Sequence, residues 1–161
     1  MSVAFNFSRR TWLARWAAAL VGWSGAAIAA TDLQIVTTVV NITVPAGAFD
    51  PVTGLAEVTA SRGVVLQVSS DKKWELRLRA INANFVSNLP PASGGTVKPV
   101  SDLQLRDAGG GRVLVPSTSF VEIANGKKTD GPTEYVFDLI LSADSADAGV
   151  LYTAVLEFDL R

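Results

Sequence analysis

Apolar residues in this chain recur mainly at every second position, which is the spacing of a β-strand with one buried face. The clearest case is Trp74–Ala80, where four apolar residues alternate with Glu75, Arg77 and Arg79. We expect this segment to be a strand that buries Trp74 in a core and turns its charged residues toward solvent.

Long runs of β-branched residues predict further strands, because Val, Ile and Thr lose side-chain freedom in a helix. Residues 33–44 form such a run, closed by Pro45, and we expect one strand there. Residues 55–59 and 64–69 read as two strands on either side of a break at residues 61–63. Residues 82–100 contain Pro and Gly clusters and predict a long surface loop.

The last part of the chain gives the strongest pairing signal. Residues 135–142 and 150–160 are both apolar-rich, and Tyr152, Ala154, Leu156 and Phe158 alternate with polar neighbours in the second of them. Together they predict an antiparallel hairpin. Shorter strands are expected at residues 103–105, 113–115 and 119–123. The pattern predicts an all-β fold, a single antiparallel immunoglobulin-like β-sandwich of about seven to nine strands.

The first 29 residues have a different pattern. They carry Arg9, Arg10 and Arg15, then an apolar run with no acidic residue, then Ala27-Ile28-Ala29. This order is typical of an export signal peptide, with cleavage after Ala29. A retained transmembrane anchor is the alternative, but the run is shorter than the roughly 20 residues that a spanning helix needs. We therefore expect a signal peptide at residues 1–29 and a β-sandwich domain at residues 30–161.

Within this segment, residues 8–13 (Ser-Arg-Arg-Thr-Trp-Leu) resemble the twin-arginine export motif, with Trp12 in place of the usual Phe. Both the twin-arginine and the general secretory route remain open. Either route predicts a protein of the periplasm, the cell surface or the extracellular space.

The composition excludes several classes of catalytic and binding function. The chain has no Cys and no His, which excludes disulfides, thiol nucleophiles and imidazole bases. Loss of the signal leaves 11 basic against 15 acidic residues, a formal charge of −4, which argues against nucleic acid as a partner. We expect no enzyme activity, no cofactor and no stable membrane span after cleavage.

Four features are candidate sites by residue type, and each favours a structural interpretation. They are the Ser-x-x-Lys match of Ser70 and Lys73, the carboxylates of Asp138, Asp144 and Asp147, the indole of Trp74, and the glycines at residues 109–111. The first lies in a predicted turn, the carboxylates lack calcium-loop spacing, Trp74 is in phase with core residues, and the glycines precede a strand instead of a helix. No catalytic, cofactor-binding or metal-binding residue is predicted.

Two segments carry a resemblance to a known group. Residues 69–76 (Ser-Ser-Asp-Lys-Lys-Trp-Glu-Leu) and the closing residues 148–158 resemble exported bacterial surface β-sandwiches of the fimbrial-subunit and spore-coat-U kind. The chain departs from many fimbrial subunits by lacking a cysteine pair and by carrying its own last strand. The resemblance implies a subunit that assembles by pairing β-strands.

Two functions follow as expectations. The first is a secreted structural or adhesive surface protein, with residues 33–44 pairing to the sheet edge of another copy or of another surface protein to build a fimbria-like or coat assembly. Pairing of that strand inside its own sandwich is the alternative, and it is also open at this point. The second is a soluble periplasmic or extracellular binding module for a glycan or protein ligand, using residues 82–100 and aromatic side chains.

Overall fold

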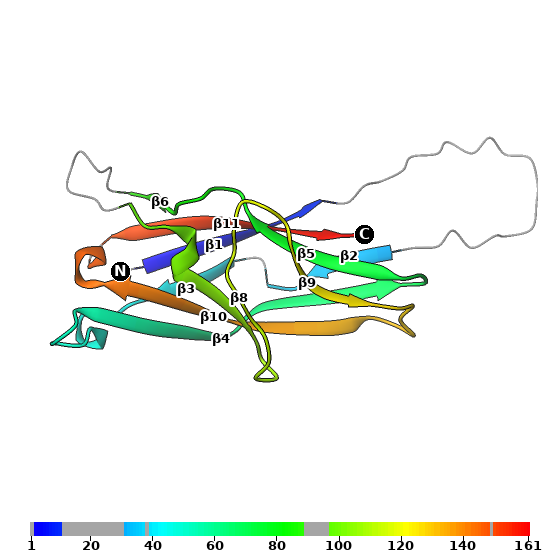
Figure 1. The fold of residues 1–161 in the computed structure, drawn as a ribbon, viewed down its shortest axis with the longest axis horizontal. Coiled ribbons are helices and arrows are strands. Elements are labelled where there is room, and N and C mark those ends of the chain that lie inside the picture. The colour runs from blue at the N-terminus through cyan, green and yellow to red at the C-terminus, as the bar shows by residue number, and fades with distance from the viewer. Residues whose placement is uncertain (1, 11–30, 38, 89–96, 149) are drawn as a thin grey trace, which may run out of the picture.

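The structure is a computed structural model that describes residues 2–10, 31–37, 39–88, 97–148 and 150–161. Strands and short 3-10 turns make up its regular elements (Figure 1). In chain order these are β1 (Ser2–Arg10), β2 (Thr31–Ile35), β3 (Val39–Thr43), η1 (Ala46–Ala48), β4 (Leu55–Ser70), β5 (Trp74–Ala80), β6 (Val86–Ser87), η3 (Val100–Asp102), β7 (Leu103–Asp107), β8 (Val113–Leu114), β9 (Val121–Gly126), β10 (Thr133–Asp144), η4 (Ser145–Asp147) and β11 (Leu151–Leu160).

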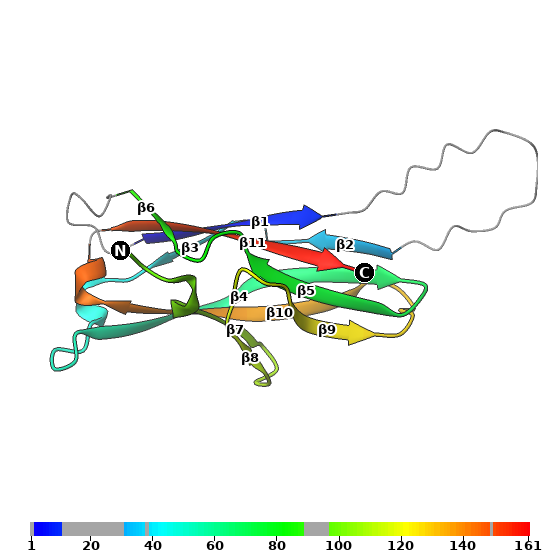
Figure 2. The ribbon, with the colours of Figure 1, turned by 45° about the horizontal axis from the view of Figure 1, so that its top comes forward.

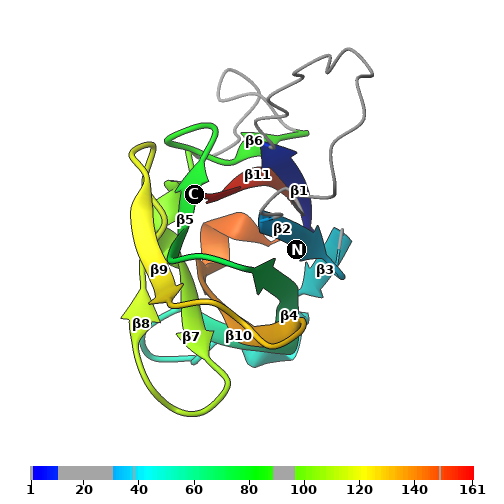
Figure 3. The ribbon, with the colours of Figure 1, turned by 90° about the vertical axis from the view of Figure 1, so that its right-hand side faces the viewer.

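The strands form two sheets packed face to face, so the predicted all-β sandwich is confirmed. One sheet has the order β3-β1-β11-β5-β9, with β6 also paired to β11, and the other has the order β2-β4-β10-β7-β8. Seen end-on in Figure 3, β11, β1 and β5 lie in one layer, and β10, β4 and β7 lie in the other. Among the described strands, all pairs are antiparallel except β1 and β11, which are parallel.

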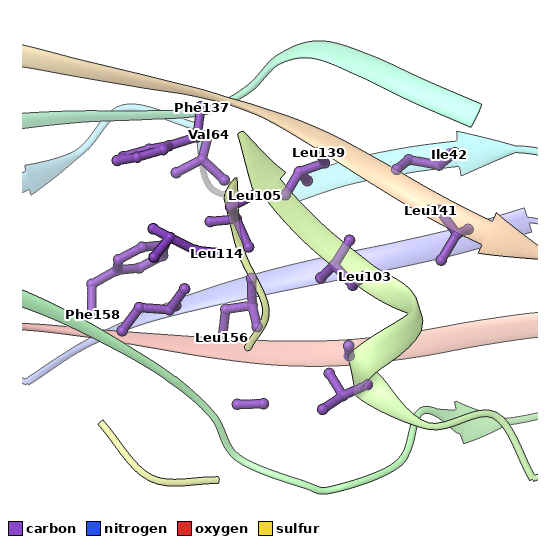
Figure 4. Packing of buried hydrophobic residues seen from close by; sticks show 14 of the residues in the cluster. Ile42, Val64, Leu103, Leu105, Leu114, Phe137, Leu139, Leu141, Leu156 and Phe158 are labelled. Carbon is purple, nitrogen blue, oxygen red and sulfur yellow. The ribbon is translucent and has the colours of Figure 1, made fainter. Parts of the chain in front are cut away.

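The core lies between the two sheets and consists of their alternate, inward-facing residues. Phe137, Leu139 and Leu141 of β10 face Leu156 and Phe158 of β11 in Figure 4, and all five are buried. Interleaved apolar side chains of two sheets are the usual way a sandwich removes its inner faces from water.

The alternation in β5 is confirmed. Its four apolar residues are buried, whereas the three charged residues between them are partly exposed. Because side chains of a strand point to opposite faces in turn, this strand contributes to the core with one face and to the surface with the other.

The single strand predicted over residues 33–44 is wrong, because the chain forms two strands in different sheets there. β2 pairs with β4, and β3 pairs with β1. After Ile35 the backbone N–H groups of Val36 and Thr37 both donate to the carbonyl oxygen of Val65, and the chain then crosses to the other sheet. A continuous β-branched run carries no signal for such a crossing.

The predicted hairpin of the last two strands is also wrong. β10 pairs with β4 and β7, whereas β11 pairs with β1, β5 and β6. The link between them is η4, whose capping box joins Asp144 and Asp147. This turn carries the chain from one sheet to the other, so both strands bury their apolar faces against each other instead of sharing a ladder.

The break predicted at residues 61–63 is absent, because β4 runs through it. Arg62 takes a positive φ of 53°, and its N–H donates to Asp138 Oδ1 at 2.9 Å. The register to β10 shifts at this point, as a β-bulge requires. The predicted loop of residues 82–100 contains the short β6 and the start of η3, with residues 89–96 outside the described part.

Candidate functional site

The candidate site is the strand position that β1 occupies in the first sheet. β1 lies between β3 and β11 and pairs with both (Figures 1 and 2). It is in register with β11 from Ser2 opposite Leu151 to Arg10 opposite Asp159, and with β3 from Ser2 opposite Thr43 to Asn6 opposite Val39. We call this position the strand slot, bounded by Val39–Thr43 on one side and by residues 151–159 on the other.

The slot is notable because its occupant precedes the predicted cleavage site. Ser2–Arg10 lies within residues 1–29, while both walls lie within residues 30–161. Among the strands that the structure describes, β3 pairs with β1 and with no other. Cleavage after Ala29 would therefore separate β3 from the rest of its sheet by the width of one strand, and would leave the long edge of β11 open.

The inner lining of the slot is apolar. On β11, the buried side chains that point into the core are those of Tyr152, Ala154 and Leu156. On β3, Ile42 is buried and Val40 is half-buried. The register places the backbone of residue 3 between Ile42 and Tyr152, and that of residue 5 between Val40 and Ala154. A strand in this slot therefore completes the core as well as the sheet.

The opposite face of β11 carries acidic residues that pair with arginines of β5. Asp159 is paired with Arg77, and Glu157 accepts a hydrogen bond from Arg79 Nε at 2.6 Å. Both guanidinium groups also lie over the ring of Phe120, with their carbons 4.6 and 4.7 Å from its centroid. These contacts fix the last third of β11 to β5 on the side away from the slot.

The beginning of β11 is held by a buried ion pair. Lys98 Nζ lies 2.9 Å from Asp147 Oδ2 and 2.9 Å from Asp102 Oδ2, and the Tyr152 hydroxyl donates to Asp147 Oδ1 at 2.8 Å. Lys98 and Asp147 are only 4% and 2% exposed. Asn88 adds a further contact, because its side-chain Oδ1 accepts from the Leu151 N–H at 2.9 Å.

The electrostatics of this pair favour its charged form. Burial acts to raise the pKa of Asp147, but hydrogen bonds from Lys98, the Asp144 N–H and the Tyr152 hydroxyl outweigh burial, so the pKa lies below its ordinary value of 3.8. The carboxylate thus remains ionised at neutral pH. Because these contacts hold the start of β11, and the arginines of β5 hold its end, β11 presents a fixed edge to the strand in the slot.

The residues singled out in the sequence do not form a reaction centre. Ser70 is buried, and its hydroxyl lies 3.1 Å from the Thr31 hydroxyl and donates to the Lys72 carbonyl oxygen at 3.0 Å. Ser70 ends β4, so no helix brings Lys73 one turn above it. The glycines at residues 109–111 form the turn between β7 and β8.

The carboxylates considered for calcium lie in two separate places. Asp138 stands in mid-strand and receives hydrogen bonds from the Arg62 N–H and from Arg106, whereas Asp144 lies six residues further along β10, about 20 Å away at strand spacing. Asp147 is held by Lys98. In the described ranges, no three His, Cys, Asp or Glu residues cluster in a way that could hold a metal ion.

The aromatic residues considered for a glycan site belong to the core. Trp74 is 3% exposed and packs edge-on against Tyr135, with ring centroids 5.6 Å apart. Phe85 and Tyr152 are also buried and form a similar edge-to-face pair at 6.0 Å. None of these three buried rings offers an open face for a sugar to stack on.

The slot was not predicted from the sequence because residues 1–29 have the pattern of a targeting segment, which gives no reason to expect a strand there. The signal was present, since Val3, Phe5 and Phe7 stand at alternate positions. The cleavage site at Ala29 and the whole apolar run lie outside the described residues, so the signal peptide stays a prediction.

Comparison with protein-family models finds no match, and comparison with curated protein sequences finds none either. The resemblance to fimbrial-subunit and spore-coat-U proteins therefore rests on the sequence segments alone. Across the residues that the structure describes, helices of sufficient length and apolar character to cross a membrane are absent.

Proposed function

We propose that this chain is an exported, non-enzymatic structural or adhesive surface protein, and that its processed form takes up a β-strand from another polypeptide. The observation that carries the proposal is that the strand between β3 and β11 comes from residues ahead of the predicted cleavage site. Processing would remove the occupant and leave its two walls in the mature protein.

An open slot of this kind favours association. β11 would present unpaired backbone groups along residues 151–159, and an exposed strand edge is a ready template for another chain. The apolar lining beneath it would meet water at the same time. Insertion of a foreign strand restores both the hydrogen bonds and the apolar contacts, which is the basis of recognition by strand addition.

This proposal changes the role expected for residues 33–44. Leu33, Ile42 and Val44 are buried in the chain's own sandwich, at 1%, 2% and 2% exposure, and β2 is paired with β4. Residues 33–44 therefore stabilise the chain's own sandwich, and we propose that the strand slot, instead of this segment, makes the contact for assembly. If the chain assembles as fimbrial subunits do, it accepts a strand from its partner instead of donating one.

The test uses the protein after export from a bacterial host. Its N-terminus is determined by mass spectrometry, and its size distribution is measured by light-scattering chromatography with and without a synthetic peptide of residues 2–10. We expect processing after Ala29, polymers or aggregates in the absence of peptide, and a folded 1:1 complex in its presence.

Two results would overturn the proposal. One is an exported protein that retains residues 2–10, because the slot would then be permanently filled. The other is a processed protein that is a stable monomer, ignores the peptide and protects the β11 amides from hydrogen exchange, because the sandwich would then close without a partner.

A further inference from the structure

We propose that one end of the sandwich binds an acidic polysaccharide, through exposed lysines on two neighbouring links and a pocket beside them. The first link, residues 71–73, joins β4 to β5, and the second, residues 127–132, joins β9 to β10. The inference uses neither wall of the strand slot and goes beyond the proposed function. We call the four lysines of these links the lysine end: Lys72, Lys73, Lys127 and Lys128.

The two links are far apart in the sequence but lie side by side in the fold. Trp74 pairs with Gly126 at the end of the β5–β9 ladder. Beyond this pair, the Thr129 N–H donates to the Ser70 carbonyl oxygen at 2.7 Å, and the Ser70 N–H donates to Thr129 Oγ1 at 2.9 Å. The four lysines lie between these two contacts, on facing segments at the same end of the molecule (Figure 1).

The lysine end is exposed and carries unpaired charge. Where the structure describes residues 31–161, none of the four lysines forms an ion pair, whereas every other basic residue except Arg112 has a carboxylate partner. The same links carry Asp71 and Asp130, so their net charge is +2 on a domain of formal charge −4. Like charges on facing segments are destabilising. The stability of the fold therefore gives no reason for this cluster, but an anionic partner does.

A surface pocket of about 370 Å³ lies next to these lysines. Its floor crosses three strands, because the backbone of Glu75 is hydrogen-bonded to Arg161 on one side and pairs with Asn125 on the other. The Asn125 side-chain amide donates to the Glu122 carboxylate, which fixes these two side chains relative to each other. A pocket of this volume suits a small ligand or one unit of a polymer. Its lining residues are Lys73, Trp74, Glu75, Glu122, Asn125 and Arg161.

The lining combines groups that suit an acidic sugar. Lys73 and Arg161 can donate charge-assisted hydrogen bonds to a carboxylate. The Glu122 carboxylate and the Asn125 amide oxygen can accept hydrogen bonds from hydroxyl groups. A uronic acid carries both a carboxylate and hydroxyls, and the rest of an acidic chain would cross Lys127 and Lys128. A bilayer would leave the pocket unused, and neither link offers an exposed large apolar side chain for insertion.

The test measures binding of the exported protein, whichever N-terminus it carries, to polygalacturonate by biolayer interferometry. The control polymer is fully methyl-esterified polygalacturonate, which keeps the sugar hydroxyls and loses the charge. We expect the ester to bind at least about tenfold more weakly, because it cannot pair with the lysines. Binding of the free acid should weaken as salt is added, because exposed charges are screened.

Matched variants locate the site. The double change Lys73→Gln and Lys127→Gln should weaken polygalacturonate binding about tenfold, whereas Arg112→Gln, at an exposed and unpaired cation just before β8, should leave it unchanged. Asn125→Ala should weaken binding of polygalacturonate but not of polyglutamate, which has carboxylates and no hydroxyls. Equal urea midpoints establish that the variants are folded.

Two results would overturn the inference. One is absence of binding to polygalacturonate, or equal binding by the parent and the double lysine variant, because the lysines would then only be solvated. The other is binding of polyglutamate or of phosphatidylglycerol vesicles as tight as that of polygalacturonate, because the lysine end would then accept any anionic surface. Neither result bears on the proposed function, which is tested separately through processing and the peptide of residues 2–10.

Discussion

The buried pair of Lys98 and Asp147 offers the sharpest test of how β11 is held. In Asp147→Ala, the ammonium of Lys98 stays 4% exposed and keeps only Asp102 of its two carboxylate partners. The Tyr152 hydroxyl loses its acceptor at the same time. Removing one partner of a buried ion pair leaves an uncompensated charge and costs about 3–5 kcal/mol. The remaining contact to Asp102 places the expected loss near the lower end, at about 3 kcal/mol.

The matched control is Asp102→Ala. Its carboxylate also lies 2.9 Å from Lys98 Nζ, but its side chain is 34% exposed, against 3% for Asp147. Because about a third of the Asp102 side chain is exposed, solvent screens this pair, and we expect it to contribute about 1 kcal/mol or less. Both variants are made in the full chain, Met1–Arg161, and the free energy of unfolding is measured by urea titration followed through Trp fluorescence. Equal losses in the two variants, or a loss below about 1 kcal/mol for Asp147→Ala, would refute the reasoning.

The same pair predicts a direction for the pH dependence. Since the folded-state pKa of Asp147 lies below 3.8, its contribution to stability is fully present at neutral pH and is lost as the pH falls below 3.8 through the lowered folded value. The unfolding free energy of the parent chain should therefore fall more steeply in this acid range than that of Asp147→Ala. Parallel curves for the two proteins would show that the carboxylate does not titrate with folding.

Two further variants test packing on β9 and β5. Gly126→Ala should destabilise the chain by about 1–3 kcal/mol, because a Cβ there would lie 2.6 Å from the Trp74 ring, whereas Gly47→Ala, with nothing within 4 Å, should be nearly neutral in the same urea titration. Phe120→Ala should cost about 1–2 kcal/mol, because two guanidinium groups lie over its ring, and in 1 M salt the loss should be smaller if the ring contacts are mainly electrostatic.

The parts of the fold that could be predicted from sequence are those set by local side-chain pattern. The alternation in Trp74–Ala80 determines which face is buried, and the β-branched runs determine that the part of the chain described by the structure forms strands and no long helix. Local composition predicts a break at residues 61–63. This prediction is wrong because Arg62 adopts a left-handed conformation stabilised by Asp138, 76 residues away in sequence.

Which strands pair could not be predicted in the same way. Two apolar strands separated by a short polar link suit a hairpin in one sheet and equally suit an arch between two sheets. In the structure the link is η4, where Asp147 is part of the capping box and also pairs with Lys98, so a long-range ion pair stabilises the crossing. The candidate site escaped prediction for a related reason, because pairing between Ser2–Arg10 and β11 spans nearly the whole chain.

The contacts around β11 predict that its edge stays folded when the slot strand is absent, as the proposed function requires. One end of β11 is held by the Lys98 and Asp147 pair and by Asn88, and the other end by Arg77 and Arg79 on the face away from the core. None of these contacts is made by the slot strand, so we expect them to persist when residues 2–10 are absent. β3 lacks such support, because its described pairing is with β1 alone. The processed protein should therefore keep one rigid wall and one loose wall, and an incoming strand would order β3 as it binds. Hydrogen exchange that protects β11 before peptide addition and β3 only after it would show this sequence of events directly.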